Sequence, residues 1–198
     1  MSNCLFLQGD MKVGKSTLLL ESVHPYLACT GGFMVQRLFS GEHLKAFCLH
    51  QVAAEPWSVN AEYKGNEANI FLQKTDHGWQ SFPEVFTRIG PCLPQWAKKN
   101  KLMLLDEIGG VELLSEVFWE NLYQVLGSGI PCIGVVKSLT NSKIMQESVA
   151  LSDRYQKLHK QLLTDIKGKF SGEIMELTTS NRPFVKQEIA AFLKRLDF

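Results

Sequence analysis

Apolar runs that fit buried strands alternate along this chain with stretches that have helical spacing. The strand-like runs are short, end at glycine or polar residues, and cover 3–8, 101–105, 131–136 and 173–178. The helix-like stretches between and after them cover 16–23, 83–99, 110–127, 141–165 and 183–196. Buried strands separated by helices predict an α/β fold, with a mainly parallel sheet in the middle of three layers.

Two segments depart from this alternation. Residues 33–39 and 43–50 favour strands and are separated by three turn-forming residues, which predicts a hairpin. Residues 51–80 are largely polar without a regular pattern, and they are interrupted by Pro56, Gly65 and Gly78. They fit no clear helix or strand. We expect a single domain over residues 1–198, with an insertion or mobile segment at about 51–80.

A glycine-rich loop follows the first strand-like run and precedes the first helix. It matches GxxxxGK[ST] and consists of Gly9, Asp10, Met11, Lys12, Val13, Gly14, Lys15 and Ser16, followed by Thr17. The glycines let the backbone curl so that successive N–H groups point at phosphate oxygens, and the helix adds its positive end. Lys15 would reach the β- and γ-phosphates, and the Ser16 hydroxyl would bind Mg²⁺. The loop predicts a site for a nucleoside triphosphate.

Two carboxylates, Asp106 and Glu107, follow the strand-like run at 101–105. Ligands of nucleotide-binding sheets lie beyond the carboxyl ends of the strands, so both side chains are expected near the phosphate loop. Asp106 would hold Mg²⁺ through water, because Mg²⁺ keeps part of its hydration shell. Glu107 would orient and deprotonate a water molecule for attack on the γ-phosphorus. A base at this position favours hydrolysis over a switch function.

Composition and charge narrow the class of protein. Hydrophobic residues make up 45% of the chain and charged residues 21%, which excludes a mainly disordered chain and a coiled coil. Lysine and arginine number 21 against 20 aspartate and glutamate, with no basic stripe, so duplex nucleic acid is not an expected partner. Apolar runs are too short for a membrane span, and the N-terminus does not resemble a signal peptide. Five cysteines without a Cys-x-x-Cys pair fit reduced thiols in a cytoplasmic protein.

Three further residues are candidates for the site, each with a plain alternative. Arg37 lies on an apolar run, where it would either clamp the γ-phosphate or face outward on a polar side of the strand. Asn181 and Arg182 follow the last strand, where an amide and a flat guanidinium would contact the base or ribose. The alternative is that Asn181 or Ser180 caps the last helix, and the capping and nucleoside-binding roles are compatible.

Other polar residues are weaker candidates. Lys137 and Ser138 end the strand-like run at 131–136, where a polar side chain would sense the γ-phosphate. Glu112 follows the acidic pair by about one helical turn and would bond a backbone group or cap the helix. Residues whose ordinary reading is a solvated surface or simple packing are Arg88, Arg154, Lys157, Trp57, Trp79 and the five histidines.

Four segments together resemble the small nucleoside-triphosphatases of the THEP1 type. The run from Asp106 to Leu113 is similar to their DEIGxxEL motif, and the phosphate loop matches theirs in type and place. Residues 32–37 are similar to their Gly-Phe…Arg segment, and residues 174–182 to their C-terminal strand followed by Asn-Arg. Ser16 stands where the family usually has threonine, and its hydroxyl keeps the same role.

The resemblance implies a compact P-loop fold of the additional-strand, catalytic-glutamate type. It also implies Mg²⁺-dependent hydrolysis of nucleoside triphosphates, ATP or GTP among them, to diphosphate and phosphate with loose base preference. We expect slow turnover, because no second arginine finger is evident. We also expect a monomer, with a protein partner left open.

Two other functions share the same phosphate loop. A small-molecule or nucleoside kinase would need an acceptor pocket and a lid that excludes water, and residues 51–80 or 141–168 would have to supply them. A regulatory or assembly module would use nucleotide binding to change a surface, with hydrolysis only resetting it.

Overall fold

A computed structural model of the chain describes residues 3–52 and 58–196. Its strands are β1 (Cys4–Gln8), β2 (Thr30–Ser40), β3 (His43–Gln51), β4 (Asn60–Glu62), β5 (Ile70–Thr75), β6 (Gly78–Ser81), β7 (Leu102–Ile108), β8 (Cys132–Val136) and β9 (Glu173–Glu176). Its α-helices are α1 (Lys15–Val23), α2 (Glu84–Ile89), α3 (Cys92–Lys99), α4 (Glu116–Leu126), α5 (Leu139–Val149), α6 (Asp153–Lys167) and α7 (Arg182–Lys194). Two 3-10 helices, η1 (His24–Cys29) and η2 (Val111–Leu114), complete the described elements.

All strands of the described residues join one sheet in the order β6-β5-β3-β2-β7-β8-β1-β9, with β4 pairing beside the end of β2. The neighbouring strands β2, β7, β8, β1 and β9 are all parallel to one another. Strands β3, β5 and β6 extend the sheet beyond β2 with antiparallel pairs. Strand β8 separates the strand before the phosphate loop from the strand that carries the acidic pair. This order confirms the predicted α/β class and the additional-strand type.

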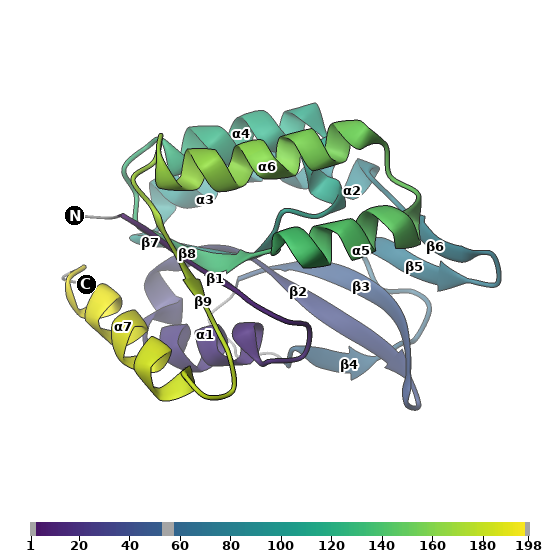
Figure 1. The fold of residues 1–198 in the computed structure, drawn as a ribbon, viewed down its shortest axis with the longest axis horizontal. Coiled ribbons are helices and arrows are strands. Elements are labelled where there is room, and N and C mark those ends of the chain that lie inside the picture. Colours follow the sequence, from purple (N-terminus) through teal and green to yellow (C-terminus); the bar gives the residue numbers. More distant parts are fainter. Residues whose placement is uncertain (1–2, 53–57, 197–198) are drawn as a thin grey trace.

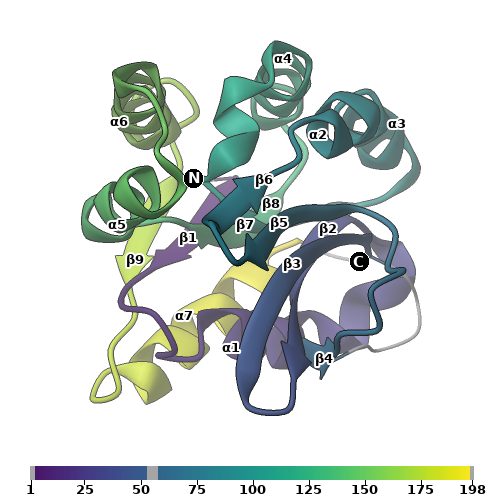
Figure 2. The ribbon, with the colours of Figure 1, turned by 90° about the vertical axis from the view of Figure 1, so that its right-hand side faces the viewer.

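Helices cover both faces of the sheet. Helices α1 and α7 lie on one face, and α2 to α6 lie on the other, as two perpendicular views show (Figures 1 and 2). The buried apolar residues form a separate cluster on each face: Leu7, Leu18 and Ile189 belong to the first, and Phe6, Phe118 and Leu162 to the second. Successive residues of a strand point to opposite faces, so β1 contributes to both clusters. The three-layer prediction is confirmed.

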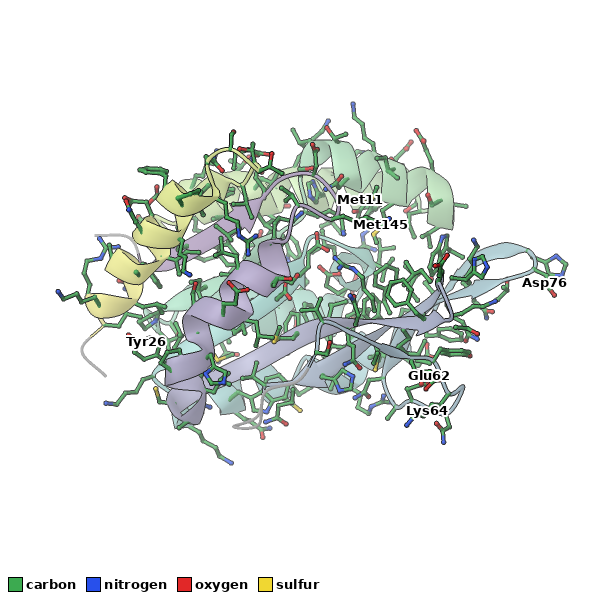
Figure 3. All side chains as sticks on the ribbon, turned by 90° about the horizontal axis from the view of Figure 1, so that it is seen from below. Met11, Tyr26, Glu62, Lys64, Asp76 and Met145 are labelled. Atoms are coloured by element: carbon green, nitrogen blue, oxygen red, sulfur yellow. The ribbon has the colours of Figure 1, made fainter. Side chains whose placement is uncertain are left out.

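The segment at 51–80 adds strands to the sheet where it is described. Strand β4 pairs with β2, and the β5–β6 hairpin extends the sheet beyond β3. Trp79 packs against Phe47 with ring centroids 5.5 Å apart, whereas Trp57 lies outside the described residues. Asp76, at the tip of the hairpin, projects away from the phosphate loop at Met11 (Figure 3). That this segment is an insertion stays a prediction.

The helical pattern at 110–127 predicted a single helix, which is wrong. The structure has η2, a break at Ser115, and then α4. The Ser115 hydroxyl accepts from Phe118 N–H and so begins a new helix, as serine does at N-cap positions. The long pattern at 141–165 contains two helices, α5 and α6, and Ala150 between them has a left-handed backbone. No helix in the described part of the chain is long and apolar enough to cross a membrane.

Candidate nucleotide site

The phosphate loop connects β1 to α1 and depends on glycine at both ends. Gly9 has φ +141°, and a Cβ built there would lie 2.3 Å from the Leu177 carbonyl oxygen. Gly14 has φ +89° and forms the N-cap of α1. Both conformations are strained for residues with side chains, so the loop geometry follows from these two positions.

The first turn of α1 presents backbone donors to the loop. The first intrahelical bond runs from Leu18 N–H to the Gly14 carbonyl oxygen, so the N–H groups of Lys15, Ser16 and Thr17 precede it. Such groups, together with the positive end of the helix dipole, bind phosphate. The geometry expected from GxxxxGK[ST] is present.

The Lys15 ammonium lies over the loop. It is buried and donates to the carbonyl oxygens of Gly9 at 2.8 Å and Asp10 at 2.7 Å. Burial lowers the pKa of Lys15, and the nearby cations Lys137 and Arg37 lower it further, whereas Glu107 and Asp106 act in the opposite direction. A triphosphate would supply the negative charge that this ammonium now finds only in carbonyl dipoles.

Asp106 is fully buried at the end of β7 and reaches across to α1. Its Oδ1 accepts a hydrogen bond from the Ser16 hydroxyl at 3.0 Å. Its Oδ2 is buried and has no hydrogen-bond partner among the described residues. A hydroxyl beside a carboxylate with an unsatisfied oxygen is a donor set that suits Mg²⁺, a hard cation with oxygen ligands. The two residues predicted for the metal are therefore brought together.

Burial raises the pKa of Asp106 to about 7, and the charge of Glu107 raises it too, whereas Ser16, Arg37 and Lys15 oppose the shift. Because the folded pKa exceeds the ordinary value of 3.8, the folded protein holds a proton between about pH 4 and 7 that the unfolded chain has lost. The stability contributed by this group is therefore present at low pH and lost as pH rises through 7. A shift of this size corresponds to at most about 4 kcal/mol.

We therefore expect Asp106→Asn to unfold at a higher temperature than wild type at pH 8 without Mg²⁺, because the amide avoids a buried charge. The difference should shrink when both proteins are melted at pH 5, where wild-type Asp106 holds its proton. Thermal melts at the two pH values measure it. A variant that is no more stable than wild type at pH 8 would contradict the assigned burial cost.

Glu107 forms an ion pair with Lys137. Its Oε2 lies 3.1 Å from the Lys137 Nζ, and the two side chains are 28% and 12% exposed. Asp106 reaches Ser16 of α1, whereas Glu107 reaches Lys137. Lys137 follows β8, the neighbouring strand. The carboxylate predicted as a base thus lies beside Asp106 and contacts a cation from the adjacent strand end.

Arg37 lies on β2, whose Met34 pairs with Asp106 in register. In the alternation of β2 it follows Phe33 and Val35, on the side of the sheet that α2 to α6 cover. Its charge adds to burial in lowering the pKa of Lys15 and opposes burial at Asp106. Arg37 is therefore within electrostatic reach of the site, and its contact with the γ-phosphate stays a prediction.

Asn181 and Arg182 lie at the start of α7, where Arg182 reaches the phosphate loop at Gly14. The Asn181 amide bonds within its own turn, accepting from Thr178 N–H and donating to the Glu176 carbonyl oxygen, both at 2.8 Å. Arg182 donates to the Gly14 carbonyl oxygen at 3.4 Å and lies 3.7 Å from Glu21. Asn181 holds the N-cap position of α7 without a side-chain cap bond, so the predicted capping by its side chain is wrong. Contact with a base stays a prediction.

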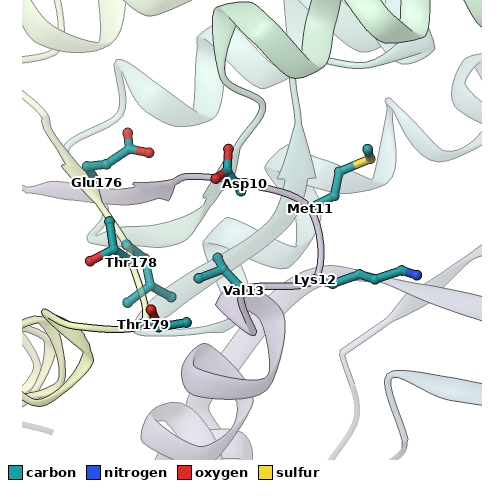
Figure 4. A pocket seen from close by; sticks show the side chains of 8 residues that line it. Asp10, Met11, Lys12, Val13, Glu176, Thr178 and Thr179 are labelled. Carbon is teal, nitrogen blue, oxygen red and sulfur yellow. The ribbon is translucent and has the colours of Figure 1, made fainter.

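A cavity of about 300 Å³ opens between the phosphate loop and the turn after β9 (Figure 4). Its lining consists of Asp10, Met11, Lys12, Val13, Glu176, Leu177, Thr178 and Thr179. Figure 4 shows the Lys12 side chain extending away from the β9 side of this cavity. The position past the last strand agrees with the place predicted for the nucleoside.

Of the weaker candidates, Ser138 and Glu112 bond backbone groups, whereas Arg154, Arg88 and Lys157 bond surface residues or are exposed. Ser138 caps α5, because its hydroxyl accepts from Asn141 N–H at 3.2 Å. Glu112 is buried and accepts from the N–H groups of Gly109 at 2.5 Å and Gly110 at 2.8 Å, as predicted for a backbone partner. Arg154 pairs with Glu116 on an exposed surface, Arg88 bonds Asn69, and Lys157 is exposed.

Three buried polar residues near the site were missed from the sequence. Asn141 donates to the Gly9 carbonyl oxygen at 3.0 Å, the same oxygen that Lys15 contacts. Tyr155 donates to the Gly109 carbonyl oxygen, and His159 bonds the Lys137 carbonyl oxygen, each at 2.8 Å. A polar residue at an otherwise apolar helical spacing is the only local signal for any of them, and it does not name a partner.

Comparisons with known proteins agree with this geometry. A family model described as NTPase matches residues 4–190. The fold is similar to that of the crystal structure of THEP1 from the hyperthermophile Aquifex aeolicus, with a TM-score of 0.63 and 19% identity over 97% of this chain and 99% of that chain. A search of curated proteins finds no significant match. The resemblance drawn from four motifs is confirmed, and because the family match spans most of its length, the chain belongs to the NTPase family.

Proposed function

We propose that this protein hydrolyses nucleoside 5′-triphosphates to diphosphate and phosphate, slowly and with loose base preference, in the presence of Mg²⁺. The observation that carries the proposal is the placement of Glu107. Its carboxylate directly follows the buried Asp106, which reaches Ser16 in the phosphate loop, and it is only partly exposed. A proton acceptor next to the residues proposed to hold Mg²⁺ supports hydrolysis, because a protein that only binds nucleotide does not need one.

The loop and α1 hold the triphosphate. Backbone N–H groups of the loop and of the first turn of α1 bind phosphate oxygens, and the Lys15 ammonium exchanges its two carbonyl partners for the β- and γ-phosphates. The nucleoside occupies the cavity beside Thr178 and Thr179. Ser16 and, through water, Asp106 would hold Mg²⁺, which withdraws charge from the phosphate oxygens when bound.

Glu107 accepts the proton of the attacking water. The water oxygen bonds to the γ-phosphorus while the bond from that phosphorus to the oxygen that bridges it to the β-phosphorus breaks. The nucleoside diphosphate leaves. Lys137 and Arg37 neutralise charge that spreads over the γ-phosphoryl oxygens. The ion pair of Lys137 with Glu107, 3.1 Å long, supports a role for this ammonium beside the base. Positioning and electrostatics supply most of the acceleration.

The test is phosphate release from ATP, GTP, CTP and UTP, each with and without Mg²⁺. We expect Mg²⁺-dependent release from all four, with rates that differ less than tenfold. Tight binding of triphosphates without release would contradict hydrolysis. Diphosphate production that depends on an added acceptor, with no free phosphate, would show a kinase instead. Capture of a partner only with a non-hydrolysable triphosphate, together with absent turnover, would show a regulatory module.

A further inference from the structure

Helix α6 places one buried hydroxyl group and one buried imidazole group against the ends of β7 and β8. Tyr155 and His159 lie one helical turn apart, and both are fully buried. The Tyr155 hydroxyl donates to the Gly109 carbonyl oxygen at 2.8 Å. The His159 Nε2 lies 2.8 Å from the Lys137 carbonyl oxygen. Both contacts therefore end on backbone atoms next to the Glu107–Lys137 ion pair.

These backbone atoms belong to one hydrogen-bonded unit. Lys137 N–H donates to the Ile108 carbonyl oxygen at 2.9 Å, which joins the end of β8 to the end of β7. Gly109 is bonded on both sides, because its N–H donates to Glu112 and its carbonyl oxygen accepts from Tyr155. The main chain that carries Glu107 and Lys137 is thus fixed from the side of α6 and η2.

The hydrogen bond of His159 defines its tautomer. A carbonyl oxygen only accepts, so Nε2 carries the hydrogen, and Nδ1 is a lone pair that is buried without a partner in the described part of the chain. Burial lowers the pKa of His159, and the Lys137 charge lowers it too, whereas the bond to the Lys137 carbonyl raises it. The imidazole therefore acts as a hydrogen-bond donor to the Lys137 carbonyl.

Helix α6 is also docked by contacts that involve neither Tyr155 nor His159. The helix already buries Leu162 and Ile166 in the core, and it has a second polar anchor, the bond from Tyr123 of α4 to Asp165 at 2.8 Å. A buried hydroxyl or imidazole costs free energy unless it is bonded, and both of these are bonded to the backbone at the site. The positions of Tyr155 and His159 are therefore better explained by their bonds to the Gly109 and Lys137 carbonyls than by docking of the helix.

We propose that Tyr155 and His159 are positioning residues for triphosphate hydrolysis: they hold the Gly109 and Lys137 carbonyls and thereby set where the Glu107 carboxylate and the Lys137 ammonium meet the γ-phosphate. This rests on the hydrolysis proposed above. General-base attack requires placement within a fraction of an ångström, and displacements of about 1 Å cost roughly a hundredfold in rate. Neither residue touches the phosphate loop, so nucleotide binding does not depend on them.

The experiment compares four variants in Mg²⁺-dependent phosphate release and in binding of a non-hydrolysable triphosphate. Tyr155→Phe and His159→Leu each remove one donor, and we expect kcat to fall roughly tenfold to a hundredfold while the Kd for the analogue changes less than twofold. His159→Gln keeps an N–H at about the same reach and should restore kcat to within about threefold of wild type. Tyr123→Phe removes a tyrosine hydroxyl bond to α6 away from the site and should leave kcat unchanged.

Each other outcome overturns the proposal. Tyr155→Phe is nearly isosteric and keeps the helix packing. An unchanged kcat in this variant would overturn the proposal even if His159→Leu fails to fold. An equal loss in Tyr123→Phe would show that docking of α6 alone matters. A parallel loss of kcat and of analogue binding would show a general disturbance of the fold. Absence of release by wild type would overturn the hydrolysis proposal and this one with it, whereas release by wild type with insensitive variants would overturn only this one.

Discussion

Replacing Glu107 by glutamine should lower kcat for triphosphate hydrolysis by roughly 10²–10⁴-fold, the usual contribution of a positioned general base. The amide has the shape of the carboxylate but does not accept the proton of the attacking water. Triphosphate affinity should stay within about threefold of wild type, because Glu107 forms its ion pair with Lys137, outside the phosphate loop. Phosphate release in single-turnover conditions and titration with a non-hydrolysable triphosphate measure the two effects separately.

A matched control exists on α4. Glu116 also pairs with a cation, Arg154, but both side chains are well exposed, so Glu116→Gln should change neither kcat nor binding. Equal phosphate release by wild type and Glu107→Gln would keep the activity and remove Glu107 as its base. Loss of binding in Glu107→Gln would show that this carboxylate organises the loop.

Replacing Lys15 by alanine should have the second large effect, on binding. A buried, hydrogen-bonded charge contact contributes about 2–5 kcal/mol, so the Kd for triphosphate should rise by roughly 30-fold to several thousandfold. Hydrolysis at subsaturating triphosphate should fall at least as much. Isothermal titration with a non-hydrolysable triphosphate and Mg²⁺ measures the change, and a thermal melt shows that the variant is folded.

Lys12 provides the comparison for Lys15, because it belongs to the same loop but is exposed. Its side chain extends from the loop away from the β9 side of the cavity (Figure 4). Lys12→Ala should therefore change the Kd by no more than about threefold. If the two alanine variants weaken binding equally, then the loop attracts phosphate through its general charge and the specific placement of Lys15 is irrelevant.

Much of the fold could be predicted because its signals are local. The parallel strands β1, β7 and β8 are buried on both faces, so each is a continuous apolar run. The hairpin of β2 and β3 follows from the turn signal at Gly41 and Glu42, although Ser40, predicted as part of the turn, pairs with His43 in the sheet. The phosphate loop and the acidic pair need particular residue types at fixed spacing, and this is why they stand out without any structure. Asp106 and Ser16, far apart in the sequence, were rightly assigned to one place.

What was missed depends on contacts that no local pattern contains. Asn141, Tyr155 and His159 are buried because α5 and α6 cross over the site, and a sequence window of one helix does not show what lies beneath it. The break at Ser115 was missed because its hydroxyl outweighs an uninterrupted apolar spacing. The strands at 60–81 form an edge that is half exposed, so their alternation is weak.

The order of strands has a consequence for how the protein is made. Of the described strands, β1 is synthesised before all others, yet both of its neighbours, β8 and β9, come from the second half of the chain. Until they are synthesised, both edges of β1 are bare, and the carbonyl oxygen of Leu177, against which Gly9 packs, does not exist. Pairing between such distant segments is slow and comes late in folding. The phosphate loop, although encoded first, is therefore among the last parts to take shape, and a nascent chain gains no stability from nucleotide until β9 has joined the sheet.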